Sequence, residues 1–124
     1  MDTKSLRKPE AAASTLSKAV VRAARLLNIK QTMLAGILGI SGATASRLAA
    51  GEYTLQPNRK EWELAALFVR MFRSLDALLG HGGQAHTWLT TRNRALGNAP
   101  VELLESTEGL VRVVHYLDAY RGQI

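Results

Sequence analysis

Apolar residues recur at intervals of three and four positions along most of this chain, which is the spacing of one face of an α-helix. The pattern predicts an amphipathic helix from Ser14 to about residue 27, carried by Leu16, Ala19, Val20, Ala23, Ala24 and Leu27. A second helix follows the break at residues 28–30 and ends at Gly39. No segment alternates apolar and polar residues with period two, so we expect an all-α protein.

The third predicted helix, residues 42–50, is unusually poor in large side chains. Ser41 precedes it, and a serine hydroxyl there can accept a hydrogen bond from a free amide of the first turn. Gly51 follows it, and glycine adopts the left-handed conformation that commonly ends a helix. A helix of about nine residues is not stable alone. Tertiary packing therefore has to hold it in place.

A loop over residues 52–58 precedes the longest predicted helix, residues 58–79, and we expect Asn58 and Glu61 to form a capping box at its start. Apolar residues cover more than one face of this helix. Such a helix either lies at the centre of the core or shares a face with a second copy of the chain. The second possibility predicts a homodimer.

Gly80, Gly82 and Gly83 follow the long helix, and we place a domain boundary there. Beyond it, the apolar spacing predicts three shorter helices over residues 86–96, 100–105 and 107–121, the last capped by Ser106. The predicted organisation is a flexible tail (1–12), a helix-turn-helix domain (13–80) and a small three-helix domain (81–124).

The second and third helices have the features of a helix-turn-helix. Ala35 lies where the two helices cross, and a larger side chain there would force them apart. Gly39 occupies the turn, which requires a backbone conformation that costs other residues free energy. Apolar residues fill the inner face of the pair: Leu34, Leu38, Ile40, Ala45 and Leu48.

With those residues directed inward, the outer face of the third helix carries Ser41, Gly42, Ala43, Thr44, Ser46 and Arg47. Small residues allow a helix to enter the major groove of DNA, where polar side chains reach base edges. We expect Thr44, Ser46 and Arg47 to lie closest to the bases. Arg47 binds either guanine or a phosphate.

The start of the second helix is a further candidate contact. Gln31 and Thr32 occupy the place where such modules hold the DNA backbone. Lys30 precedes them, either as a phosphate contact or as an ordinary surface lysine. The predicted DNA-binding residues are thus Lys30, Gln31, Thr32, Ser41, Ala43, Thr44, Ser46 and Arg47.

Charge is distributed unevenly along the chain. Residues 1–60 contain 10 lysine and arginine residues against three acidic ones, whereas residues 61–124 contain six against seven. A basic half suits a polyanion such as double-stranded DNA, because neutralised phosphates release their counterions. The alternative interpretation is that these basic residues are scattered over the surface and serve only to keep the protein soluble. The two halves are expected to meet different partners.

Composition argues against several other classes of protein. The chain has no cysteine, no apolar run long enough to span a membrane and no apolar stretch typical of a signal peptide, so we expect a cytoplasmic protein without a membrane partner. His81, His86 and His115 have no second ligand at metal-binding spacing. Neither the carboxylates nor the serines form a catalytic pattern. We therefore predict no enzyme, no metal and no cofactor.

Residues 14–79 resemble the Xre-type, or phage-repressor-like, helix-turn-helix regulators. The C-terminal stretch resembles the toxin-binding domain of MbcA/ParS/Xre antitoxins through Trp88, Leu89, Asn93, Leu96, Gly97, Pro100, Leu103, Leu104, Gly109, Val113 and Leu117. The spacing of tryptophan, asparagine, glycine and proline is the specific part. The resemblance implies a cognate RES-domain toxin, of a family associated with destroying NAD, and repression of the antitoxin's own operon.

The resemblance also implies that the C-terminal end of the antitoxin reaches the active-site cleft of the toxin. That end consists of Tyr120, Arg121, Gly122, Gln123 and Ile124. Trp88, Tyr116 and Tyr120 are aromatic residues of the kind that anchor interfaces, and Trp88 and Tyr116 also fit the core of a small domain. The alternative function is a stand-alone dimeric repressor without a toxin partner.

Overall fold

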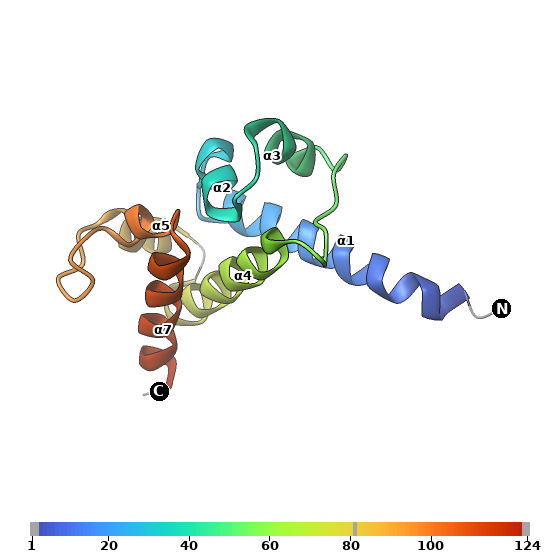
Figure 1. The fold of residues 1–124 in the computed structure, drawn as a ribbon. Coiled ribbons are helices and arrows are strands. Elements are labelled where there is room, and N and C mark those ends of the chain that lie inside the picture. The colour runs from blue at the N-terminus through green and yellow to red at the C-terminus, as the bar shows by residue number, and fades with distance from the viewer. Residues whose placement is uncertain (1–2, 81, 123–124) are drawn as a thin grey trace.

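The computed structural model describes residues 3–80 and 82–122. Within this part of the chain every regular element is a helix: α1 (Thr3–Leu26), α2 (Gln31–Leu38), α3 (Gly42–Ala49), α4 (Lys60–Leu79), α5 (Gly83–Thr90), α6 (Pro100–Leu103) and α7 (Thr107–Gly122). Figure 1 shows α2 and α3 above one end of α4, and α5 and α7 at its other end. The predicted all-α fold is confirmed.

Helix α1 is longer than the apolar spacing predicts. It begins at Thr3 and includes Pro9, whereas the spacing starts only at Ser14 and predicts a tail over residues 1–12. The first half of the helix projects from the body of the protein (Figure 1). Helix propensity favours the extension, because alanine is the best helix former and the run at residues 11–13 continues the helix upstream of the apolar spacing, with Ala13 already buried. Amphipathic spacing detects only the part of a helix that is packed.

The connection between α3 and α4 lies across α1 and is held there by a buried serine. The Ser17 hydroxyl donates to the Ala13 carbonyl oxygen at 2.7 Å and accepts from the Leu55 backbone amide at 2.9 Å. Leu55 itself is fully buried. Leaving such a buried amide without a partner would cost about 1–3 kcal/mol. Ser17 therefore fixes the loop that follows α3.

The start of α4 differs from the predicted capping box. Arg59 precedes the helix and makes no capping bond, so Asn58 lies outside the cap position. Glu61 turns back to the loop instead, and its carboxylate accepts from the Tyr53 hydroxyl at 2.6 Å and from the Gln56 amide at 3.0 Å. The prediction was wrong because the loop folds over the start of α4 and brings these two donors to the buried carboxylate.

Tyr53 provides a test of this contact. Burial, followed by the hydrogen bond to Glu61, raises the pKa of Tyr53 above its ordinary value of 10.0. The folded state holds the phenol proton more firmly than the unfolded state, so this contribution to stability is fully present below about pH 10 and is lost as the pH rises through the folded pKa. We expect Tyr53→Phe to lower the free energy of unfolding by about 1 kcal/mol at neutral pH, and by less above pH 10. Urea unfolding of both proteins measures the difference, and a difference that stays constant with pH contradicts this account.

Helix α4 is the centre of the fold. Phe68, Met71 and Leu75 are fully buried, and the helix packs against α1, α2, α5 and α7. Most of its apolar surface is therefore covered within a single chain, with α7 as its most extensive neighbour, whereas Leu79 at its end is 36% exposed. Of the two interpretations of this helix, the central position in the core is confirmed. Much of the surface that suggested a homodimer is used inside the chain, and the homodimer stays a prediction.

The core continues across the glycines at which the sequence places a domain boundary. Apolar residues from α1 to α7 form one cluster. The two halves also meet at the turn after α1, where Nδ1 of the His86 ring lies 3.0 Å from the Leu27 carbonyl oxygen. A second contact joins Glu105 to Gly36 of α2. The described chain is therefore one packed unit with two ends.

The C-terminal half contains less helix than predicted. Helix α5 ends at Thr90 instead of continuing to Leu96. Residues 91–99 form a loop around Asn93, whose side-chain oxygen accepts from the Leu96 amide at 3.2 Å. Gly97 has a φ of +81° in this loop, a conformation that glycine adopts readily. An asparagine side chain competes with a helix for backbone amides, which explains the early end of α5.

The junction between α6 and α7 is tightly packed. Ser106 caps α7 as predicted, because its hydroxyl accepts from the Gly109 amide at 3.0 Å. Gly109 lies directly against the end of α6, and a Cβ added to it would stand 2.0 Å from the Leu103 carbonyl oxygen. Glycine therefore allows the start of α7 to approach the backbone of α6.

Candidate functional site

The α2–α3 pair has the internal geometry that the sequence predicts. Gly39 has a φ of +69°, and both its amide and the Ile40 amide donate to the Ala35 carbonyl oxygen. Ala35 itself is buried. The remaining inner residues are also buried, apart from half-buried Ile40: Leu34, Leu38, Ala45 and Leu48.

The outer face of α3 consists of small and polar side chains. Ser41, Ala43, Ser46 and Arg47 are exposed and Thr44 is half-buried. The Ser41 hydroxyl accepts from the Thr44 amide at 3.0 Å and donates to the Thr44 hydroxyl at 2.9 Å, as expected of a cap. One Arg47 nitrogen lies 3.4 Å from the same hydroxyl. Ser41 and Thr44 are thus bonded to each other at the start of α3, whereas Ser46 and Arg47 are exposed and Arg47 contacts the Thr44 hydroxyl through only one nitrogen.

The start of α2 is exposed on the same helix pair. Lys30 occupies the cap position with extended backbone and makes no capping bond with its side chain. Gln31 and Thr32 are exposed in the first turn. No side chain at the cap position therefore satisfies the first amides of α2, and such amides attract anions.

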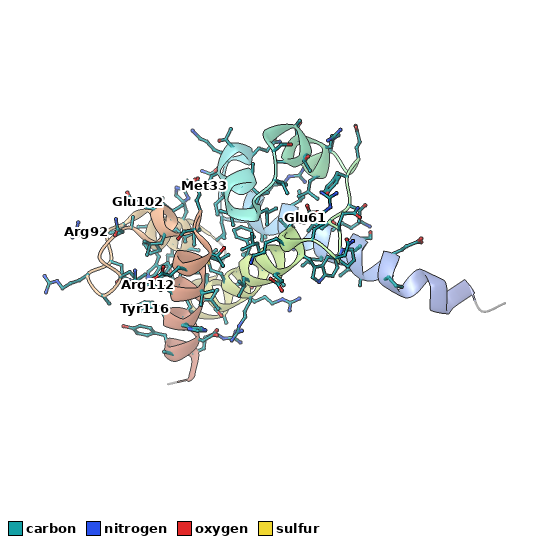
Figure 2. The ribbon with its side chains drawn as sticks, viewed as in Figure 1. Met33, Glu61, Arg92, Glu102, Arg112 and Tyr116 are labelled. Carbon is teal, nitrogen blue, oxygen red and sulfur yellow. The ribbon has the colours of Figure 1, made fainter. Side chains whose placement is uncertain are left out.

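Three aromatic side chains form a ladder at the other end of the molecule. The Trp88 and Tyr116 rings stack with centroids 6.1 Å apart, and the Tyr116 and Tyr120 rings lie 5.0 Å apart. The two tyrosine hydroxyls are 3.2 Å apart, and this hydrogen bond raises the pKa of Tyr120. Trp88 and Tyr116 are half-buried, whereas Tyr120 is 49% exposed. Figure 2 shows Tyr116 on the outer side of α7.

Two hollows adjoin this ladder, and we call them together the aromatic groove. The larger has a volume of about 720 Å³ and the smaller about 290 Å³, and Leu79 and Trp88 line both. Leu79 is 36% exposed. Arg92 lines the larger hollow, and Figure 2 shows it pointing away from the body. Sequence reasoning missed Leu79, although it ends a helix with more apolar positions than one face requires.

The end of α7 is tied to α4 by polar contacts. The Arg121 guanidinium donates to the Ser74 hydroxyl at 3.2 Å, and that hydroxyl lies 3.2 Å from the Asp118 carboxylate. Arg70 forms an ion pair with the same carboxylate. Arg121 is exposed like Tyr120 and Gly122, but its guanidinium reaches back to α4. Gln123 and Ile124 lie outside the described residues.

Other kinds of site find no support in the described part of the chain. It contains no group of three histidine, cysteine, aspartate or glutamate side chains that could hold a metal ion. None of its helices combines the length and apolarity that crossing a membrane requires. His86 contacts a backbone carbonyl oxygen, as described above, and His81 lies outside the described residues.

Comparison with known families agrees with the division into two ends. Residues 7–70 match the antitoxin Xre-like helix-turn-helix domain, and residues 74–122 match the antitoxin Xre/MbcA/ParS C-terminal toxin-binding domain. The boundary between the two matches falls at residues 71–73, inside α4. Neither domain is enzymatic. No curated protein matches the sequence significantly. Because the matched domains cover nearly all of it, the chain belongs to the Xre/MbcA/ParS family of antitoxins.

Proposed function

We propose that this antitoxin binds operator DNA through the outer face of α3 and neutralises a RES-domain toxin through the C-terminal end of α7. One observation carries the proposal: the chain exposes two unlike surfaces at opposite ends. The outer face of α3 carries small and polar side chains and the exposed Arg47. The aromatic groove instead combines Leu79 and the three aromatic rings with polar side chains of α5 and the following loop, such as Arg92. One molecule can therefore hold DNA and a toxin at the same time and repress its own operon.

The polar groups of α3 support a division of roles at the DNA. Ser41 and Thr44 are bonded to each other, so they stabilise the start of the helix. The exposed Arg47 retains several donors, and two parallel donors are what recognition of guanine in the major groove requires. We propose that Arg47 reads a base from α3, supported by Ser46. The exposed residues at the start of α2 then hold the DNA backbone: Lys30, Gln31 and Thr32.

The shape of the C-terminal end supports insertion into a cleft. Helix α7 is regular to Gly122, and its end projects beyond α4 (Figure 1). A half-exposed aromatic residue at such an end can bury much of its surface on binding and so act as an anchor. We propose that the active-site cleft takes Tyr120, Arg121, Gly122, Gln123 and Ile124. The rim of the cleft then packs against Trp88 and Tyr116 in the aromatic groove.

We also propose that two copies bind one palindromic operator. A helix-turn-helix reads one half-site, and symmetric half-sites lie about 34 Å apart. Since α7 covers much of the apolar face of α4, we expect the contact between copies to use another surface. The first half of α1 projects from the body (Figure 1), so we expect the copies to meet through α1 or only on the DNA.

Arg47→Ala tests the DNA-binding half of the proposal. We expect its affinity for the DNA upstream of the antitoxin's own gene to fall by about 1–3 kcal/mol, and its preference over unrelated DNA to fall as well. Arg73→Ala removes another exposed arginine, from α4, and should change neither quantity. Mobility-shift titrations with both DNAs measure the effect, and the mass of the complex gives the number of copies. An equal loss with both DNAs would make Arg47 a phosphate ligand, and no loss would contradict the assigned face.

A further inference from the structure

A row of cations on α1 has no role in the helix-turn-helix contacts described so far. Lys18, Arg22 and Arg25 are spaced by four and three residues, so they share one side of α1, and all three are exposed. They line a groove of about 330 Å³. Its opposite wall is the end of α3 and the following loop, including Ala49, Gly51 and Thr54. Figure 1 shows this loop descending from α3 towards α1.

The groove is surrounded by more positive than negative charge. Tyr53 also lines it, and the charges of Arg59 and Arg47 both act on the Tyr53 hydroxyl. Of the two nearby acids, Glu61 is buried and bonded to the loop, which leaves Glu52 as the exposed one. The cations of α1, α3 and the loop therefore form a basic region at the C-terminal end of α3.

Two members of the row are available for a partner. Arg25 donates to the Ala49 carbonyl oxygen at 3.3 Å, so it also stabilises the end of α3. Lys18 and Arg22 form no ion pair with the carboxylates of the described residues. Exposed cations in a row beside a DNA-reading helix suit phosphates, because each neutralised phosphate releases counterions.

We propose that Lys18 and Arg22 bind backbone phosphates of the operator beyond the C-terminal end of α3, as a second DNA contact besides α2 and α3. The inference rests on the proposed function of α3. DNA is favoured over an acidic surface of the toxin, because the aromatic groove lies at the other end of α4. These contacts strengthen binding to any sequence, since phosphates carry no base information.

The double variant Lys18→Gln/Arg22→Gln tests this second contact. Its affinity for the upstream DNA is measured at several salt concentrations, together with that of the wild type. Loss of two phosphate contacts makes the slope of log affinity against log salt less steep by about 1.8, since each contact contributes about 0.9. Preference for the operator over unrelated DNA stays at the wild-type value, in contrast to Arg47→Ala. Both side chains are exposed, so thermal unfolding stays at the wild-type temperature.

The control variant Arg73→Gln/Arg94→Gln removes the same charge from exposed positions in α4 and the 91–99 loop. Its salt slope stays at the wild-type value if the inference is correct. An unchanged slope for Lys18→Gln/Arg22→Gln, or an equal change in the control, overturns the second contact. Loss of toxin binding with intact DNA binding assigns the row to the toxin and overturns it too. A wild-type protein that fails to bind the upstream DNA contradicts the proposed function itself, which is a distinct result.

Discussion

Gly109→Ala will destabilise the folded protein by about 3 kcal/mol or more, the largest effect we expect from a single methyl group. The added Cβ would stand 2.0 Å from the Leu103 carbonyl oxygen and 2.9 Å from its carbonyl carbon. Both are backbone atoms, so no side-chain rotation relieves the overlap. Helix α7 would have to move away from α6, and its packing on α4 would be disturbed. Urea unfolding followed by circular dichroism measures the loss.

The matched control is Gly122→Ala, which makes the same substitution in the last turn of the same helix. No atom lies within 4 Å of a Cβ added there, so we expect unchanged or slightly higher stability. Gly36→Ala is the intermediate case, because its Cβ would meet the end of the Glu105 side chain at 2.9 Å, and this side chain can rotate away. A Gly109→Ala protein as stable as the Gly122→Ala protein would contradict the packing of α7 on α6.

Deleting residues 120–124 will abolish protection against the toxin and leave operator binding within about twofold of the wild type. The deletion removes the exposed end of α7, whereas the outer face of α3 lies at the other end of the molecule. Loss of a central aromatic anchor alone costs about 2 kcal/mol, or roughly thirtyfold in affinity. Growth of cells that co-express the toxin measures protection, and mobility shift measures operator binding. Full protection by the shortened chain would contradict insertion.

Two substitutions at Tyr120 distinguish the contribution of its ring to toxin binding from that of its hydroxyl group. Tyr120→Ala removes the ring from the aromatic groove, and we expect the roughly thirtyfold loss of toxin affinity. Tyr120→Phe keeps the ring and removes only the bond to the Tyr116 hydroxyl, so its affinity should fall less than threefold, about 0.6 kcal/mol. Similar losses for both variants would show that the hydroxyl, and not the ring, is what the toxin contacts.

Features that depend on residues three to five apart were predictable from the sequence. Ser41 and Ser106 cap their helices as expected, and Gly39 and Gly51 both have positive φ. Ala35 is buried, and its carbonyl oxygen accepts from the Gly39 and Ile40 amides of the turn. Capping and tight turns are local, so the residue types and their spacing are sufficient information.

Features that depend on distant partners were not predictable. Glu61 bonds to Tyr53 and Gln56 instead of closing a capping box, because the loop folds back onto α4. The Ser74 hydroxyl meets Asp118 and Arg121 across 44 and 47 residues. Spacing along the chain carries no information about such pairs.

The spacing and type of the residues were enough to predict that the chain is helical, that α2 and α3 form a helix-turn-helix, and that the basic and neutral halves carry different domains. Three features became visible only in the folded chain: α4 packs against both halves, α7 covers much of the apolar surface that suggested a homodimer, and Leu79 lies beside three aromatic rings in one groove. The physical reason is that the apolar spacing of a helix shows which face will be buried, whereas which element buries that face depends on the packing of the whole chain.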